Sequence, residues 1–252
     1  MSRLPRRLGH GEEATLGEHL EELRGRLFVI IGAVAVSTIV AFAFHTRLLD
    51  WLNRPLPAGH RHLLATGVAE PFTVSITVSL YAGLVLSSPV ILWQLWSFFA
   101  PAFEASAERK VLGLAAFAVA LGAAGLSFGY FVLLPRAIHW LTNYDDTHFA
   151  HLIKASSYYS FVATVLLGIV VVFQLPLVIL GLVSLGVLSS RTLRKNRRIG
   201  YFIVAVIALA LPGPDPVTTF LELLPMWGLF EGSIWLAVLF ERRQAVAPEA
   251  VL

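Results

Sequence analysis

Two glutamates, Glu222 and Glu231, are the ionised side chains that fall within the long apolar runs of this sequence. A carboxylate at membrane depth is costly and usually faces a cavity or a partner, so both residues are candidates for function. On an unbroken helix nine residues turn the chain by about 900°, which points the two side chains to opposite faces, although Pro225 between them weakens this geometry. A paired acid–base site is therefore disfavoured. A relay in a small-solute or ion transporter stays open as an alternative, and so does the reading of Glu231 as an interfacial carboxylate that reaches water near the cytoplasmic end of its helix.

Other patterns for catalysis are weak. Residues 125–129 match the G-x-S-x-G nucleophile elbow around Ser127, but they lie inside a continuous apolar run and not at a strand-to-helix turn. They favour close helix packing over hydrolysis. His148 and His151 have the spacing of two metal ligands, but no third ligand is evident, which favours ordinary loop histidines. Cysteine is absent and no nucleotide-binding P-loop occurs, so we expect no enzyme, no cofactor and no metal.

The stretch EHLEELRGRL, residues 18–27, places acidic side chains directly before the first apolar run. Leucines at 16, 20, 23 and 27 form one apolar stripe, which predicts a short amphipathic helix on the cytoplasmic surface. Glu22 and Arg26 stand four residues apart in the order that favours a helical ion pair. The residues alone thus favour a helix face that neutralises its own charge.

The composition is that of an integral membrane protein. Of 252 residues, 57% are hydrophobic and 14% charged, whereas a soluble domain carries about 25% charged residues. Six apolar runs predict six transmembrane helices in one domain. The fifth has 13 residues and would cover only about 20 Å as a helix. The predicted spans are 27–44, 72–99, 111–134, 158–187, 199–211 and 217–240.

The distribution of basic residues predicts the topology. With six spans, fourteen of the nineteen Lys and Arg residues fall on the side of both termini, which places residues 1–26 and 241–252 in the cytoplasm by the positive-inside rule. A re-entrant hairpin of the last two runs would give the same count and stays open. The two long outer loops, 45–71 and 135–157, carry apolar residues and are expected to fold as a cap. Pro89 and Pro176 are expected to bend their helices.

Read together, several stretches resemble the TatC family of twin-arginine translocase proteins. HLEELRGRL precedes the first span, and NRPL and EPF lie in the first outer loop. SSPVILWQLWSFFAPAFEASAERK runs through the second span and its turn, SSYYSFV and FQLP lie in the fourth span, and LRKNRR precedes the fifth. LPGPDPVT and LFE occupy the last hairpin. The order and spacing of these pieces match the family from His19 to Glu231.

The resemblance implies a fold and a function. The fold would be a concave cup of six helices with both termini in the cytoplasm and short fifth and sixth helices, beside which the bilayer thins. The protein would be the core receptor subunit of a translocase in the cell membrane. It would bind the twin-arginine signal peptides of folded precursor proteins and act with single-span partner subunits, as a homo-oligomer in a larger complex, using the proton-motive force.

The resemblance also implies site residues. The signal-peptide positions match Glu22, Arg24, Arg26, Phe98 and Glu108, and two adjacent guanidiniums favour paired carboxylates such as Glu22 and Glu108. Three departures stand out: AERK replaces the usual acidic-loop sequence around Glu108, the fourth span has glutamine where glutamate is frequent, and LPGPD replaces a turn with a threonine hydroxyl. Partner or structural roles are expected for Pro55, Pro89, Gln174, Asp215, Thr218, Thr219 and Glu231.

Overall fold

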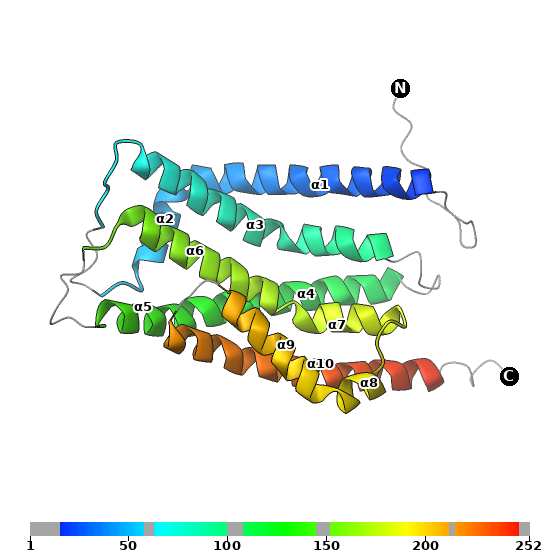
Figure 1. The fold of residues 1–252 in the computed structure, drawn as a ribbon. Helices are drawn as coiled ribbons and strands as arrows, with labels where there is room; N and C mark the ends of the chain where they lie inside the picture. The colour runs from blue at the N-terminus through cyan, green and yellow to red at the C-terminus, as the bar shows by residue number, and fades with distance from the viewer. Residues whose placement is uncertain (1–15, 58–62, 100–107, 145–151, 212–214, 247–252) are drawn as a thin grey trace, which may run out of the picture.

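The computed structural model describes residues 16–57, 63–99, 108–144, 152–211 and 215–246, and the regular secondary structure in these ranges is helical apart from one isolated β-bridge. The predicted all-helical membrane fold is confirmed (Figure 1). Within the described ranges the elements are α1 (Leu16–Ala43), α2 (His45–Asn53), α3 (Glu70–Phe99), α4 (Glu108–Phe128), the π-helix η4 (Gly129–Leu133), α5 (Leu134–Thr142), α6 (Ala155–Val172), α7 (Leu175–Ser184), α8 (Ser190–Lys195), α9 (Arg197–Ala210) and α10 (Pro216–Val246).

Five stretches of the described helices are long and apolar enough to cross a bilayer. The shortest has 24 residues, more than the roughly 20 that a span requires. Helix α9 has 14 residues and rises only about 21 Å, so the sixth span and the cytoplasmic position of both termini stay predictions. The five stretches are Leu20–Ala43, Glu70–Leu95, Ala115–Thr142, Ala155–Ser184 and Pro216–Arg242.

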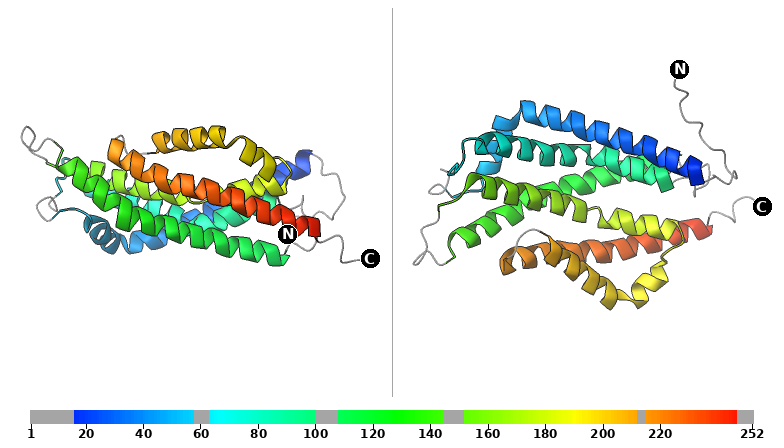
Figure 2. Two further views of the ribbon diagram at one scale, coloured as in Figure 1. Left: turned by 90° about the horizontal axis from the view of Figure 1, so that it is seen from below. Right: turned by 45° about the horizontal axis from the view of Figure 1, so that its top comes forward.

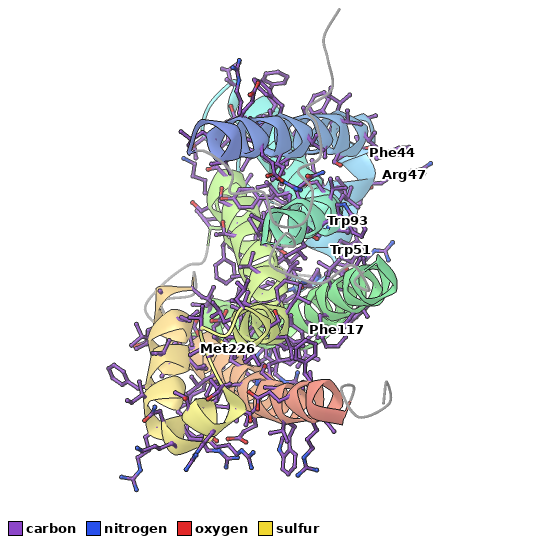
Figure 3. All side chains as sticks on the ribbon, turned by 90° about the vertical axis from the view of Figure 1, so that its right-hand side faces the viewer. Phe44, Arg47, Trp51, Trp93, Phe117 and Met226 are labelled. Carbon is purple, nitrogen blue, oxygen red and sulfur yellow. The ribbon has the colours of Figure 1, made fainter. Side chains whose placement is uncertain are left out.

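Helix α1 joins the predicted amphipathic segment and the first span into one continuous helix of 28 residues. It packs along α3, where Gly83 lies against Thr38: a Cβ built on Gly83 would lie 2.8 Å from the Thr38 Cα. The rest of α1 exposes large apolar side chains, among them Leu20 and Leu27. Seen end on, α1 lies at one margin of the bundle and α10 at the other (Figure 3).

The third span runs further than its apolar sequence indicates. Its helix passes through η4 and Pro135 and ends at Thr142, although the sequence predicted an outer loop from residue 135. Proline is tolerated here because it occupies the first turn of α5, where its missing N–H costs little. The π-helix brings Tyr130 onto Trp51 of α2, with ring centroids 3.7 Å apart and planes at 4°.

The predicted outer cap is present in the described parts of both loops. Tyr130 donates to the Trp51 carbonyl at 2.8 Å, and Tyr158 donates to the Leu52 carbonyl at 2.7 Å, so two membrane helices hold the end of α2. The two loops also meet directly, because Leu64 N donates to the Ile153 carbonyl at 2.9 Å.

The fourth span is broken between α6 and α7, with Gln174 and Pro176 at the start of α7, as the proline predicted. Helix α9 leans on α10, and α8 lies near the C-terminal half of α10 (Figure 2). Gly200 permits this contact, since a Cβ there would clash with the Phe230 ring. Met226 is fully buried in the cluster that joins α7, α9 and α10 (Figure 3).

Candidate signal-recognition site

Glu22 and Arg26 form the ion pair that their spacing predicted. Arg26 donates from Nε at 3.0 Å and from Nη2 at 2.5 Å to the same oxygen, Oε1 of Glu22. Its remaining nitrogen, Nη1, lies 3.4 Å from both the backbone carbonyl and the side-chain oxygen of Gln94. The guanidinium therefore bridges α1 and α3, and it links the Glu22 carboxylate to α3 through Arg26.

The pair is still within reach of solvent. The Glu22 side chain keeps 29% of its surface exposed and that of Arg26 keeps 21%. Neighbouring Arg24 is exposed and lies over the Phe28 ring at 5.6 Å, a position that suits an anchor at the lipid surface. A carboxylate that accepts a guanidinium while partly open to water can exchange that guanidinium for another.

For Phe98 and Glu108, the other two predicted signal-peptide-binding residues, the structure describes only the backbone. Phe98 lies in the last turn of α3 and Glu108 begins α4, while their side chains lie outside the described part of the structure. The start of α4, the end of α3 and the start of α1 share one end of the bundle (Figure 1). Pairing of Glu22 with Glu108 around two guanidiniums stays a prediction.

Gln174 joins two helices. It is buried, and its Nε2 donates to the Ala118 carbonyl of α4 at 3.1 Å, the interhelical hydrogen bond that such a residue favours. Gly122 makes room for it, since a Cβ there would lie 3.3 Å from Nε2. Within the described part of the chain its Oε1 is buried without a hydrogen-bond donor.

Asp215 caps α10. Its Oδ1 accepts from the backbone N–H of Thr218 at 2.7 Å, and its Oδ2 accepts from the Thr218 hydroxyl. The Thr219 hydroxyl donates to the Asp215 carbonyl at 3.0 Å. Both threonine hydroxyls are thus engaged within the turn, so the structural role expected of these positions is the one that the geometry supports.

The two glutamates of α10 have different surroundings. Glu231 accepts from the Tyr201 hydroxyl and lies 3.5 Å from Arg197 Nη2, so it ties α10 to α9 and does not stand alone at the interface. Glu222 is 1% exposed, and neither of its oxygens has a donor among the described residues. The two carboxylates belong to separate sites, as their spacing predicted.

The remaining candidate residues that the structure describes lie in turns or within helices. Pro55 lies in the turn after α2, next to buried Leu56, and Pro89 lies inside α3.

Ser127 is exposed on helix α4, and the glycine at 125 lets the ring of Phe173 approach, since a Cβ there would lie 2.8 Å from it. The G-x-S-x-G pattern therefore serves packing. His148 and His151 lie outside the described residues.

Sequence reasoning missed Gln94, Tyr201 and Arg197 as members of these sites. Gln94 carries the one available signal, since it is an amide near the end of an otherwise apolar run, and polar side chains there are typically used in contacts between helices. Tyr201 and Arg197 give no such signal, because aromatic and basic residues at the end of a span are ordinary.

Fold and site together define a class. The chain is a multi-pass helical protein of the cell membrane, with a carboxylate–guanidinium pair at one end of the bundle. The family model described as "Sec-independent protein translocase protein (TatC)" matches residues 18–225. The chain therefore belongs to the TatC family, and it is a component of the twin-arginine protein transport machinery.

Relatives and solved structures agree with this assignment. The chain is 34% identical over 233 residues to the "Sec-independent protein translocase protein TatCd" of Bacillus subtilis, with 92% of this chain and 95% of the relative covered. It is 36% identical over 235 residues to the chloroplastic TATC protein of Arabidopsis thaliana, covering 92% of this chain and 68% of that one. A crystal structure titled "Twin Arginine Translocase Receptor- TatC in DDM" superposes with a TM-score of 0.77 at 30% identity, covering 87% of this chain and 99% of the other. None of these findings supports the small-solute or ion transporter.

Proposed function

We propose that this chain is the core receptor subunit of a twin-arginine translocase. It binds the signal peptides of folded precursor proteins at the cytoplasmic end of the bundle and, with single-span partner subunits, moves those proteins across the membrane using the proton-motive force. The chemistry of the protein is recognition, not catalysis.

One observation carries the proposal: the carboxylate of Glu22 already holds a guanidinium. Arg26 donates two hydrogen bonds to it, and Gln94 offers Arg26 a second set of acceptors at 3.4 Å. An incoming arginine can therefore take the place of Arg26 on Glu22 while Arg26 turns toward Gln94. The exchange leaves the Arg26 guanidinium hydrogen-bonded to the neutral oxygens of Gln94, so its N–H groups keep acceptors while the incoming arginine takes over the charge pair with Glu22.

Glu108 supplies the second carboxylate in this proposal. It begins α4, at the same end of the bundle as the start of α1 (Figure 1), and it occupies the acidic position that the family resemblance implies. Two carboxylates suit two adjacent arginines because each planar guanidinium makes paired, charge-assisted hydrogen bonds. Phe98, in the last turn of α3, would contact the residues that flank the arginine pair.

The single-span partners would meet the second half of the bundle. Gln174 keeps a buried side-chain oxygen that no described donor reaches, and the adjacent break between α6 and α7 separates two helical segments. A partner helix with a polar side chain at that depth would complete the hydrogen bonding of Gln174. Oligomers of the chain with such partners would form the larger complex.

Site-specific crosslinking tests the receptor assignment. A signal peptide with a photoreactive residue next to its arginine pair is irradiated in membranes that hold the full chain. Replacing Glu22 and Glu108 with Gln should abolish the crosslink and the export of a folded precursor, whereas Glu21→Gln, one residue away and exposed, should change neither. If the double Gln variant crosslinks and exports as well as the unmodified chain, the receptor assignment is wrong.

A further inference from the structure

The segment between α7 and α9 is held in a defined shape. Gly186 turns the chain with φ of 72°, a value that favours glycine. The hydroxyl of Ser189 accepts from the N–H of Thr192 at 3.1 Å and caps α8. From the neighbouring helix α10, the Glu241 carboxylate accepts from the N–H of Ser190 at 2.8 Å and from its hydroxyl. Side chains that project from this segment are therefore presented on an ordered support.

Three cations of α8 and a fourth in the first turn of α9 form a group that we call the α8–α9 basic cluster. All four are exposed, and within the described residues they make no hydrogen bond or ion pair through their side chains. The carboxylates that α10 brings to this region are held elsewhere, Glu231 by Tyr201 and Arg197 and Glu241 by Ser190. Glu241 keeps its negative charge, because Ser190 is neutral, so among the described residues four cations against this one carboxylate leave the region with a net positive charge. Its members are Arg191, Arg194, Lys195 and Arg198.

An apolar surface adjoins the cluster. One side of α9 is buried against its neighbours through Val204 and Ala208, whereas Ile199, Phe202 and Leu209 are more than half exposed. Helix α9 has 14 residues and rises about 21 Å against the roughly 30 Å of a hydrocarbon core, so a bilayer that α9 spans, as the sequence predicts, thins beside it. Thinning draws lipid headgroups toward the end of α9, where the basic cluster begins.

We propose that the α8–α9 basic cluster binds the phosphate headgroup of an anionic phospholipid, whose acyl chains lie against the exposed face of α9. Grouped Lys and Arg side chains at the end of a membrane helix favour anionic lipids, and the planar fork of Arg suits a phosphate. A lipid fits better than a free phosphate because a phosphate would leave the apolar face of α9 uncovered. The site lies at the margin of the bundle opposite α1 (Figure 3), so it is separate from the proposed receptor site at Glu22.

A lipid-binding titration tests this site. The purified full chain in detergent micelles is titrated with dansyl-labelled phosphatidylglycerol and, separately, with dansyl-labelled phosphatidylcholine, and energy transfer from tryptophan reports binding. Each cation near a membrane surface strengthens binding by about fivefold, so phosphatidylglycerol should bind at least about tenfold more tightly. The preference for phosphatidylglycerol over phosphatidylcholine should shrink at high salt, because salt screens the attraction between exposed charges. Equal affinity for the two lipids would overturn the proposal.

Two sets of variants locate the site. Changing Arg191, Arg194, Lys195 and Arg198 together to Gln should remove the preference. The matched control changes three arginines and one lysine at the other end of the bundle, Arg47, Arg54, Arg136 and Lys154, all exposed, and should keep it. Equal losses in both sets would contradict the assignment. If the first set fails to fold, Arg191→Lys with Arg194→Lys and Arg198→Lys keeps the charge and should retain the preference. Displacement of the lipid by millimolar inorganic phosphate would show a phosphate site and no lipid site.

Discussion

The guanidinium of Arg26 donates two hydrogen bonds to a single oxygen of Glu22, at 3.0 Å and 2.5 Å. Its third nitrogen faces Gln94 on the next membrane helix. The pair is thus more than a local contact on one helix face, because it fixes the direction of the carboxylate relative to α3. A side chain fixed in this way loses less conformational entropy when it binds a ligand.

The first prediction concerns arginine against lysine in the signal peptide. A twin-lysine peptide should bind at least about tenfold more weakly than a twin-arginine peptide, because lysine lacks the planar fork. In Glu22→Gln the difference should narrow to a few-fold, since the charge-assisted pair is lost. Anisotropy of a labelled peptide with the purified chain measures all four affinities. An unchanged ratio in Glu22→Gln would place the discrimination elsewhere.

The second prediction concerns the support of α2. Tyr158→Phe should lower the free energy of unfolding by about 1–3 kcal/mol, because the Leu52 carbonyl that accepts from it loses its donor in a buried position. Tyr144→Phe is the control, since that side chain is exposed. Thermal unfolding in detergent measures both variants, and equal stabilities would argue against a fixed cap.

The third prediction concerns the crossing of α1 and α3. Gly83→Ala places a methyl group 2.8 Å from the Thr38 Cα, so the helices must separate, at a cost of about 1–3 kcal/mol. Gly32→Ala meets nothing within 4 Å and should be neutral or slightly stabilising, because alanine favours helix. Denaturant titration of the two variants distinguishes the results. A neutral Gly83→Ala would mean that the two backbones do not approach this closely.

The fourth prediction concerns the start of α10. Asp215→Ala removes the acceptor of the Thr218 N–H and hydroxyl and should cost about 0.5–2 kcal/mol, as loss of an N-terminal cap does. Asp215→Asn keeps an oxygen at the same place and should lose much less. Comparing the unfolding midpoints of the two variants separates capping from charge. Equal losses would show that the negative charge, and not the cap, stabilises the turn.

Much of the fold was predictable from the sequence because the bilayer sets the length of an apolar run. Some helices are longer than the apolar runs in the sequence, because the polar residues or the proline next to the run are also compatible with a helix. The segment before residue 27 continues into α1 since its leucine stripe already has helical spacing. Pro135 does not end its helix because it lies in the first turn of α5, after a π-helix that no pattern in the sequence predicted.

The candidate site was predictable where its contacts are local. Glu22 and Arg26 lie one helical turn apart, so their spacing alone indicated the pair. Gln94 is 68 residues from Arg26, and only the packing of α3 on α1 brings it near. The link from Glu231 to Tyr201, 30 residues away, depends in the same way on how α9 leans on α10. Periodicity describes one helix at a time and cannot supply such contacts.

The close approach of Gly83 to Thr38 bears on how the protein is made. It lets the first two spans form a hairpin whose contacts need no later part of the chain. Both spans leave the ribosome before the later helices do, and early segments generally fold first. Glu22, Arg26 and Gln94 all belong to this hairpin. Their contact is therefore among the first tertiary features that each new molecule completes during insertion.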